Sequence, residues 1–404
     1  MSHTSGPAGP LIPSRRMMYY LCLLGFFAIF STTISKNPVL PLFTQALGAD
    51  DTIIGLIAAF SPLAGILFSF PVGVLSDHFG RKRLLMSAGA VFLIAPLLYF
   101  FISNPLWLIP VRFFHGTATA ILGPVISAVI AERFPENRGE MLGQYSSATL
   151  IGRTIAPLAG GIIISFFVFS PGLLSFHIVY AAAALAAVPV FVMTLMYRED
   201  GSGPLNVLPF AAFRESFFLF FSNPRLRATA WADMATYFAY GALETFLPLY
   251  LFSRGIGAYE TGIIFAVQVL VIAATKPFFG MAADRIDKRI QICAGLVITG
   301  FAVAVIPILP SFGMFLLASS VFGIGISFST IATSAYVAEI ANREQIGASM
   351  GALSSIMDIG QTSGPLVTGI IITAAGYATG FLTSFLLALA VTVVFAVSVR
   401  GRAA

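Results

Sequence analysis

Seven ionisable side chains interrupt the long apolar segments of this sequence. They are Lys36, Arg112, Arg153, Asp233, Glu244, Lys276 and Asp358. In apolar surroundings a charged group is costly unless it is paired or hydrated, and a carboxyl group there can take up and release a proton near neutral pH. These residues could therefore form ion pairs, bind a charged ligand or carry protons.

Two of the acids belong to one stripe of polar residues. Asp233 and Glu244 are eleven residues apart, close to three turns of an α-helix, and Tyr237 and Tyr240 fall on the same stripe. A face with two carboxyl and two phenol groups is expected to line a central cavity. Glu244 is our first candidate for a proton-coupling acid, with a permanent salt bridge as the alternative. Asp233 suits a gate or a structural pair equally well.

Other polar residues are expected near the same depth. Arg112 and His115 share a helix face, and His115 could titrate, although histidines that only pack between helices are commoner. Arg153 and Asp358 lie at comparable depth in two other segments, and Gln361 shares the face of Asp358. We take Arg112 and Asp358 as further proton-coupling candidates. His115, Arg153 and Gln361 are candidates for lining the cavity.

The rest of the sequence is too apolar for a soluble protein. Of 404 residues, 58% are hydrophobic and only 10% are charged, and the mean hydropathy is +0.92. A bilayer suits such a surface, at about 20 residues per helical span. Apolar segments occupy residues 17–41, 52–75, 84–103, 105–131, 143–168, 176–197, 227–251, 257–280, 290–309, 312–338, 349–375 and 378–399. We therefore predict an all-α membrane protein with twelve transmembrane helices.

The basic residues indicate how the chain crosses the bilayer. With the N-terminus placed inside, 17 of the 22 Lys and Arg residues fall in loops and tails on that side, and one, Arg254, falls on the other. Because positive loops stay cytoplasmic, both termini are predicted in the cytoplasm of a cell (inner or plasma) membrane. Lys276 is expected to reach the headgroups. The net charge of +5 then requires no nucleic-acid partner.

The longest connection divides the spans into two groups of six. We predict a cytoplasmic tail over 1–16, a six-helix bundle over 17–197, a linker over 198–226, a second six-helix bundle over 227–399 and a tail over 400–404. Within the linker, Phe210–Phe221 has the composition of an amphipathic helix in the membrane interface. Cys22 and Cys293 lie in apolar segments and predict neither a disulfide nor a metal site.

The two groups of spans repeat at an offset of 207 or 208 residues. Gly73 and Asp77 recur as Gly280 and Asp284. The same offset relates Pro41 to Pro248, Gly55 to Gly262, Glu132 to Glu339, Gly152 to Gly360, and Pro157 to Pro365. A shared offset across separate landmarks predicts two parallel six-helix bundles, with a binding site between them near the midplane.

The repeat also predicts an ion pair. Asn37 corresponds to Glu244 at the offset of 207, and repeat-related positions lie at similar depth, here in the outer third of the membrane. Lys36, beside Asn37, should then pair with Glu244 and link the halves on the outside when the protein opens inward. Protonation of Glu244 would weaken that link.

These motifs resemble those of the major facilitator superfamily over essentially the whole chain. Gly73-x-x-x-Asp77-x-x-Gly80-Arg81-Lys82-Arg83 matches the family's cytoplasmic signature between helices two and three, and the second copy contains Gly280, Asp284 and Arg285. The resemblance implies that Asp77 bonds the neighbouring helix ends in the outward-facing state. The basic cluster could anchor the turn on anionic headgroups. Alternatively, it could only keep this loop on the cytoplasmic side of the membrane.

Further motifs resemble those of the twelve-helix drug:proton antiporter family. Asn37-Pro38-Val39-Leu40-Pro41 is similar to its first-helix motif, and Arg112-x-x-x-Gly116 to a fourth-helix motif whose arginine is associated with proton coupling. The stretch from Gly143 to Gly161 resembles the fifth-helix motif, with Ala156 where glycine is usual. Its Gly152, Pro157 and Gly161 imply a hinge or seal between the halves, with ordinary close packing as the alternative.

Together these features predict proton-coupled export of a small amphipathic organic compound by alternating access. The alternative is a proton symporter that imports a sugar or an organic anion, which Lys36, Arg112 and Arg153 favour. Departures from the drug-exporter pattern make a dedicated metabolite exporter as consistent as a multidrug pump. No nucleophile–base motif, metal spacing or nucleotide loop supports an enzyme or a receptor. We expect a monomer without a cofactor, whose partners are the bilayer, protons and a small-molecule substrate.

Overall fold

A computed structural model describes residues 14–198, 220–283, 285–341 and 346–399 of the chain. These residues form α-helices and three short 3₁₀ turns, with no β-strand among them. Ten helical segments are long and apolar enough to cross a membrane. One of them, α13 (Ile346–Val399), holds two spans that meet at Gly376, where φ is 81°. Together with α9 (Pro224–Ser253), they confirm the predicted all-α fold with twelve spans.

The first half of the chain forms the helices α1 (Ser14–Ile34), α2 (Val39–Ala46), α3 (Asp51–Phe79), α4 (Arg81–Leu98), α5 (Leu108–Arg133), α6 (Arg138–Phe166) and α7 (Leu174–Met196). The second half forms α9, α10 (Ala258–Ala283), α11 (Lys288–Ala304), α12 (Phe312–Ile340) and α13. Short turns η1 (Tyr99–Phe101), η2 (Pro105–Trp107) and η3 (Ile306–Ile308) adjoin α4, α5 and α11. Polar caps start several helices: Asp50, Asn223 and Asp287 accept hydrogen bonds from first-turn amides.

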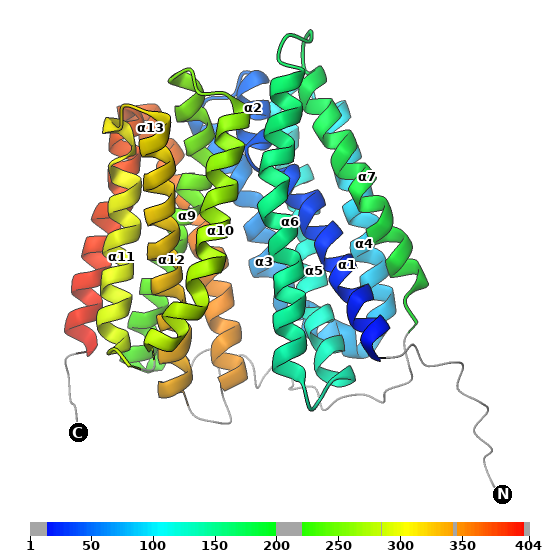
Figure 1. Ribbon diagram of the computed structural model, residues 1–404, viewed down its shortest axis with the longest axis vertical. Coiled ribbons are helices and arrows are strands. Elements are labelled where there is room, and N and C mark those ends of the chain that lie inside the picture. Colours follow the sequence, from blue (N-terminus) through cyan, green and yellow to red (C-terminus); the bar gives the residue numbers. More distant parts are fainter. Residues whose placement is uncertain (1–13, 199–219, 284, 342–345, 400–404) are drawn as a thin grey trace, which may run out of the picture.

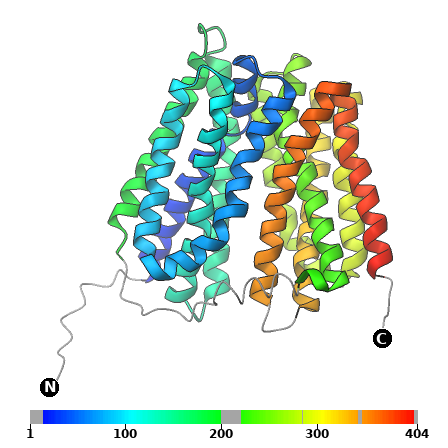
Figure 2. The ribbon, with the colours of Figure 1, turned by 180° about the vertical axis from the view of Figure 1, so that it is seen from behind.

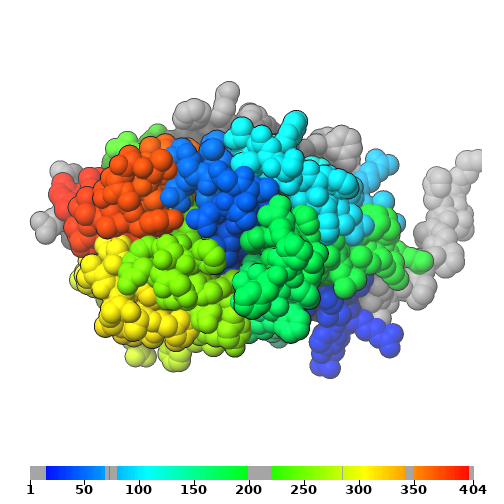
Figure 3. Space-filling model, turned by 90° about the horizontal axis from the view of Figure 1, so that it is seen from above, coloured from blue at the N-terminus to red at the C-terminus, as the bar shows by residue number. Residues whose placement is uncertain are grey.

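The two halves stand side by side with their helices roughly parallel, as Figures 1 and 2 show. Helix α1 begins and α13 finishes at the same end of the molecule, which we call the terminal end. The opposite end, which carries α2, is called the distal end. Seen from the distal end, the side chains of the two halves meet (Figure 3).

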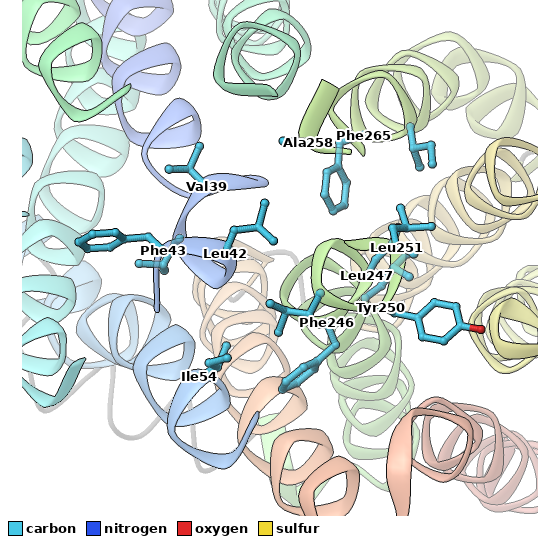
Figure 4. Packing of buried hydrophobic residues seen from close by; sticks show 14 of the residues in the cluster. Val39, Leu42, Phe43, Ile54, Phe246, Leu247, Tyr250, Leu251, Ala258 and Phe265 are labelled. Atoms are coloured by element: carbon cyan, nitrogen blue, oxygen red, sulfur yellow. The ribbon is translucent and has the colours of Figure 1, made fainter. Parts of the chain in front are cut away.

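An apolar cluster joins the halves at the distal end. It brings Val39 and Leu42 of α2 together with Phe246 of α9 and Phe265 of α10 (Figure 4). The clusters of buried residues nearer the terminal end each belong to one half. In the described part of the chain, therefore, the hydrophobic contact between the halves is concentrated at the distal end.

Close backbone contacts at this interface occur in symmetric pairs. An added Cβ at Gly55 of α3 would collide with the carbonyl oxygen of Pro365 in α13, and one at Gly262 of α10 with that of Pro157 in α6. These two contacts are related by the sequence repeat, which connects Gly55 to Gly262 and Pro157 to Pro365. The structure thus makes the same helix contact twice, as expected for two parallel repeats around one axis.

Three sequence expectations differ from the structure or fall outside it. The first span is not continuous over 17–41, because α1 ends at Ile34 and a turn precedes α2. Most of the linker lies outside the described residues, although Phe220 is buried against Leu226 of α9. Asp284 also lies outside them, and Gly73 and Asp77 lie in α3 at positions whose side chains are not described.

Candidate functional site

A cavity of about 550 Å³ lies between the halves and adjoins the distal cluster. Its lining comes from both halves. The ionisable residues in the lining are Lys36, Arg112, Arg153, Glu244, Lys276 and Asp358. Other polar groups come from Asn37, Tyr237, Tyr240, Gln268, Thr330 and Gln361. Most of the polar residues that interrupt the apolar spans therefore converge on one space.

The predicted ion pair closes the distal side of this cavity. Lys36 Nζ lies 2.6 Å from Glu244 Oε2. The other carboxylate oxygen, Oε1, accepts hydrogen bonds from Asn37 Nδ2 and the hydroxyl of Tyr240, each at 2.7 Å. Both oxygens of Glu244 are thus bonded, and two of the three donors belong to the other half of the protein.

Asp358 faces the cavity from α13. Its carboxylate packs against Gly65 of α3, where an added Cβ would lie 2.6 Å from Oδ2. It lines the same cavity as Lys36. No hydrogen bond to this carboxylate is found among the described residues, so it is a second acid at the interface that lacks a fixed partner.

Arg153 and Lys276 bring two cations into the cavity from opposite halves. Arg153 lies on α6, one turn before Pro157, and Lys276 lies on α10. Both side chains are exposed to the cavity. Within the described ranges neither forms an ion pair or a side-chain hydrogen bond. The arrangement can bind and release charged groups, because its cations and its second acid are accessible.

Sequence comparison decides the family. The sequence model of the Major Facilitator Superfamily matches residues 21–271 and 253–403, which together span nearly all of the chain. The chain belongs to the major facilitator superfamily. It is accordingly a multi-pass membrane transporter and not an enzyme.

Individual relatives agree with this assignment. The chain is 25% identical over 381 residues to an uncharacterized MFS-type transporter of Methanocaldococcus jannaschii, covering 91% of this chain and 96% of that one. It is 26% identical over 295 residues to the multidrug resistance protein MdtG of Serratia proteamaculans, covering 70% and 69%. A bacterial homolog of the human lysosomal transporter Spinster, solved in an inward-facing, unoccupied conformation, has the same fold, with a TM-score of 0.74, 19% identity and 96% coverage of both chains.

Two predicted cavity residues of this major facilitator protein lie elsewhere. Asp233 does not line the cavity; it is 3% exposed and accepts a hydrogen bond from Thr333 of α12 at 2.9 Å. Its part of α9 is enclosed by the second half, because Gly360 lets α13 approach the backbone of α9 at Met234. His115 is likewise buried in the first half, between the rings of Phe92 and Tyr99. Packing against neighbouring helices removes both from the cavity.

The motif residues that are described lie at the turn between α3 and α4 and in the contact between α6 and α1. Gly80 has a φ of 83° and permits the tight turn between α3 and α4. Arg81 pairs with Glu132 at the end of α5, while Arg83 and Arg285 are exposed. In α6, Gly152 packs on the backbone of α1.

The fifth-helix motif, which contains Gly161, implies a hinge or seal between the halves. An added Cβ at Gly161 would collide with the carbonyl oxygen of Ala258 in the other half. Gly280, by contrast, has no neighbour within 4 Å of an added Cβ. The fifth-helix motif therefore lies at the distal contact between the halves, whereas Gly280 is placed in open space.

Two further cavity residues are not among those predicted to line it. Gln268 of α10 is 1% exposed, and its carbonyl oxygen has no hydrogen-bond partner in the described structure. Lys276 had been assigned to the lipid headgroups, but its side chain lines the cavity. A polar residue in an apolar segment was the available signal in both cases.

Proposed function

We propose that this transporter exports a small amphipathic organic compound in exchange for protons. Export is supported by the similarity to the multidrug resistance protein MdtG and by the fifth-helix motif at the distal interface. The amphipathic character is suggested by a lining that combines charged residues with Ile29, Leu150, Val269, Ile272 and Ile326.

The orientation follows from the basic residues. Because the topology predicted from the sequence puts 17 of the 22 Lys and Arg residues on the side of the termini, we assign the terminal end to the cytoplasm and the distal end to the outside. The distal cluster and the Lys36–Glu244 pair then close the outward side. On this basis the described conformation faces inward.

The Lys36–Glu244 pair is the observation that carries the proposal. The pair joins the halves on the outward side, and it can be broken in two ways. A proton can neutralise Glu244, or a substrate can take over one of the two partners. If the halves rock only when the pair is broken, each passage carries either a proton or a substrate, which is the requirement for exchange.

The proposal is tested in inverted membrane vesicles with an acidic lumen. An exporter takes up its substrate into the lumen and lets protons out, so a panel of amphipathic fluorescent dyes should include compounds that raise the luminal pH. Glu244→Gln should abolish this proton release while still binding the same dyes. Unchanged proton release in Glu244→Gln would refute the role of the pair.

The second candidate is a symporter that imports an organic anion. It is favoured by the cations in the cavity, which include Arg112 and Arg153. A symporter would accumulate labelled anions in intact cells and lose that accumulation when an uncoupler is added. It would not release protons from inverted vesicles in exchange for external substrate.

A further inference from the structure

The charges in the cavity do not balance. Four cations, Lys36, Arg112, Arg153 and Lys276, face two carboxylates, Glu244 and Asp358, which leaves a net charge of +2. The 2.6 Å pair of Lys36 with Glu244 is neutral as a unit. Three cations and one acid therefore remain for the rest of the cavity.

One of these cations is buried and forms no ion pair with any described residue. Arg112 is 1% exposed, and its Nε–H has no hydrogen-bond partner in the described structure. A buried guanidinium without an acid is costly, because it has lost its hydration and gained no counter-charge. The part of the cavity beside Arg112 therefore favours the binding of an anion.

The other two cations, Arg153 and Lys276, lie on a pair of helices that pack against each other across the interface between the halves. Helices α6 and α10 pack tightly at the distal end, where Gly161 meets Ala258 and Gly262 meets Pro157. Arg153 and Lys276 come from the same two helices on the terminal side of that contact. Both line the same cavity, and none of the described residues forms an ion pair with either of them.

We propose that the transported compound is an amphipathic organic anion whose carboxylate or phosphate group binds between Arg153 and Lys276 and so bridges the two halves. This inference rests on the proposed function and names its substrate class. The oxyanion accepts hydrogen bonds from both cations and cancels their repulsion. Its binding then draws the terminal ends of α6 and α10 together and favours closure of the inward side. A cationic compound would be repelled by the net positive charge of the cavity.

A lipid headgroup could supply the same oxyanion chemistry, so the test separates the two sources. Purified protein in nanodiscs of neutral lipid is titrated with four compounds that share one ring system: 1-naphthylacetate, 1-naphthyl phosphate, 1-naphthylacetamide and 1-naphthylmethylammonium. Inorganic phosphate is added as a small oxyanion, against chloride at equal ionic strength. Thermal stability and isothermal titration calorimetry report binding, and both are repeated in nanodiscs with anionic lipid.

We expect the two naphthyl anions to bind at least about tenfold more tightly than the amide, with the ammonium compound weakest. Arg153→Gln and Lys276→Gln should each weaken anion binding about tenfold and leave amide binding unchanged. Arg16→Gln, which removes an exposed arginine outside the cavity, is the matched control. Inorganic phosphate should stabilise the wild type more than either cavity variant.

Several results would overturn the inference. These are equal binding of the anion and the amide, no stabilisation by any anion including phosphate, or an effect of Lys276→Gln that appears only with anionic lipid. If only the ammonium compound drove proton exchange, the substrate would not be an anion, but proton-coupled export would still be supported. Tight anion binding without proton release from vesicles would keep the anion site and refute proton-coupled export.

Discussion

Asn37 and Glu244 occupy equivalent positions in the two repeats and are hydrogen-bonded to each other at 2.7 Å. When two parallel repeats are related by an axis along the membrane normal, a residue can touch its own counterpart only near that axis. The contact therefore places the neighbouring Lys36–Glu244 pair beside the symmetry axis, where the two halves meet. A charge change at this position acts on both halves with no intermediate residue.

Glu244→Gln should make the distal end open more readily and remove its dependence on pH. The pair exists while Glu244 is ionised, so the attraction to Lys36 is lost as the pH falls; glutamine is neutral at every pH. The measurement is the distance between spin labels at Gln45→Cys and Ser253→Cys, in a background that lacks Cys22 and Cys293.

Asp233→Asn is the matched control, because Asp233 is the other acid of α9 and, among the described residues, its carboxylate is bonded only within its own half. The wild type and this control should open further at low pH, whereas Glu244→Gln should show the open distance throughout. If the pH response instead disappeared in Asp233→Asn and persisted in Glu244→Gln, the proton would be carried by Asp233, and the prediction for Glu244 would be wrong.

Removing both members of the pair should be less harmful than removing one. Lys36→Met leaves Glu244, which is 7% exposed, without its counter-charge. The side chain of Lys36 is 27% exposed, so we expect a loss of less than about 3 kcal/mol. The double variant Lys36→Met/Glu244→Gln should recover much of this loss in thermal unfolding. Equal melting temperatures for the single and double variants would contradict an attractive pair.

Contacts that follow from the repeat could be predicted from the sequence. Contacts that depend on how the helices pack against one another could not. The Lys36–Glu244 pair was predictable because the offset of 207 places Asn37 and Glu244 at one depth. The position of Asp233 was not, since spacing assigns it to the face of Glu244 but does not show that α12 and α13 enclose that part of α9. Lys276 was misplaced for a related reason: its depth follows from sequence, while the face it presents depends on the packing of α10.

Alanine at Gly55 or Gly262 should weaken distal closure by similar amounts. Each glycine lets a backbone carbonyl of the other half approach, at Pro365 and Pro157 respectively, and an added methyl group would collide with it. We expect a loss of about 1–3 kcal/mol in the stability of the closed arrangement. Gly123→Ala in α5 is the control, because no atom lies within 4 Å of its added Cβ.

The spin-label distances also measure this effect. Gly55→Ala and Gly262→Ala should each shift them toward the open population, and Gly123→Ala should not. A shift in only one of the two interface variants would show that the repeat-related contacts are not energetically equivalent.

Two ion pairs at the terminal end provide a comparison within one molecule. Arg81 pairs with Glu132 in the first half, and the repeat-related Lys288 pairs with Glu339 in the second at 2.8 Å. The first pair is the more buried, with 8% and 20% of its side chains exposed against 23% and 59%. Salt screens exposed pairs far more than buried ones, and exposed pairs contribute about 0–1 kcal/mol.

Arg81→Gln should therefore lower the melting temperature more than Lys288→Gln. In about 1 M salt, where the Debye length is only about 3 Å, the effect of Lys288→Gln should vanish while most of the effect of Arg81→Gln remains. Thermal unfolding of the two variants at low and high salt measures both. If Lys288→Gln were as costly as Arg81→Gln at both salt concentrations, burial would not be what distinguishes the two equivalent pairs.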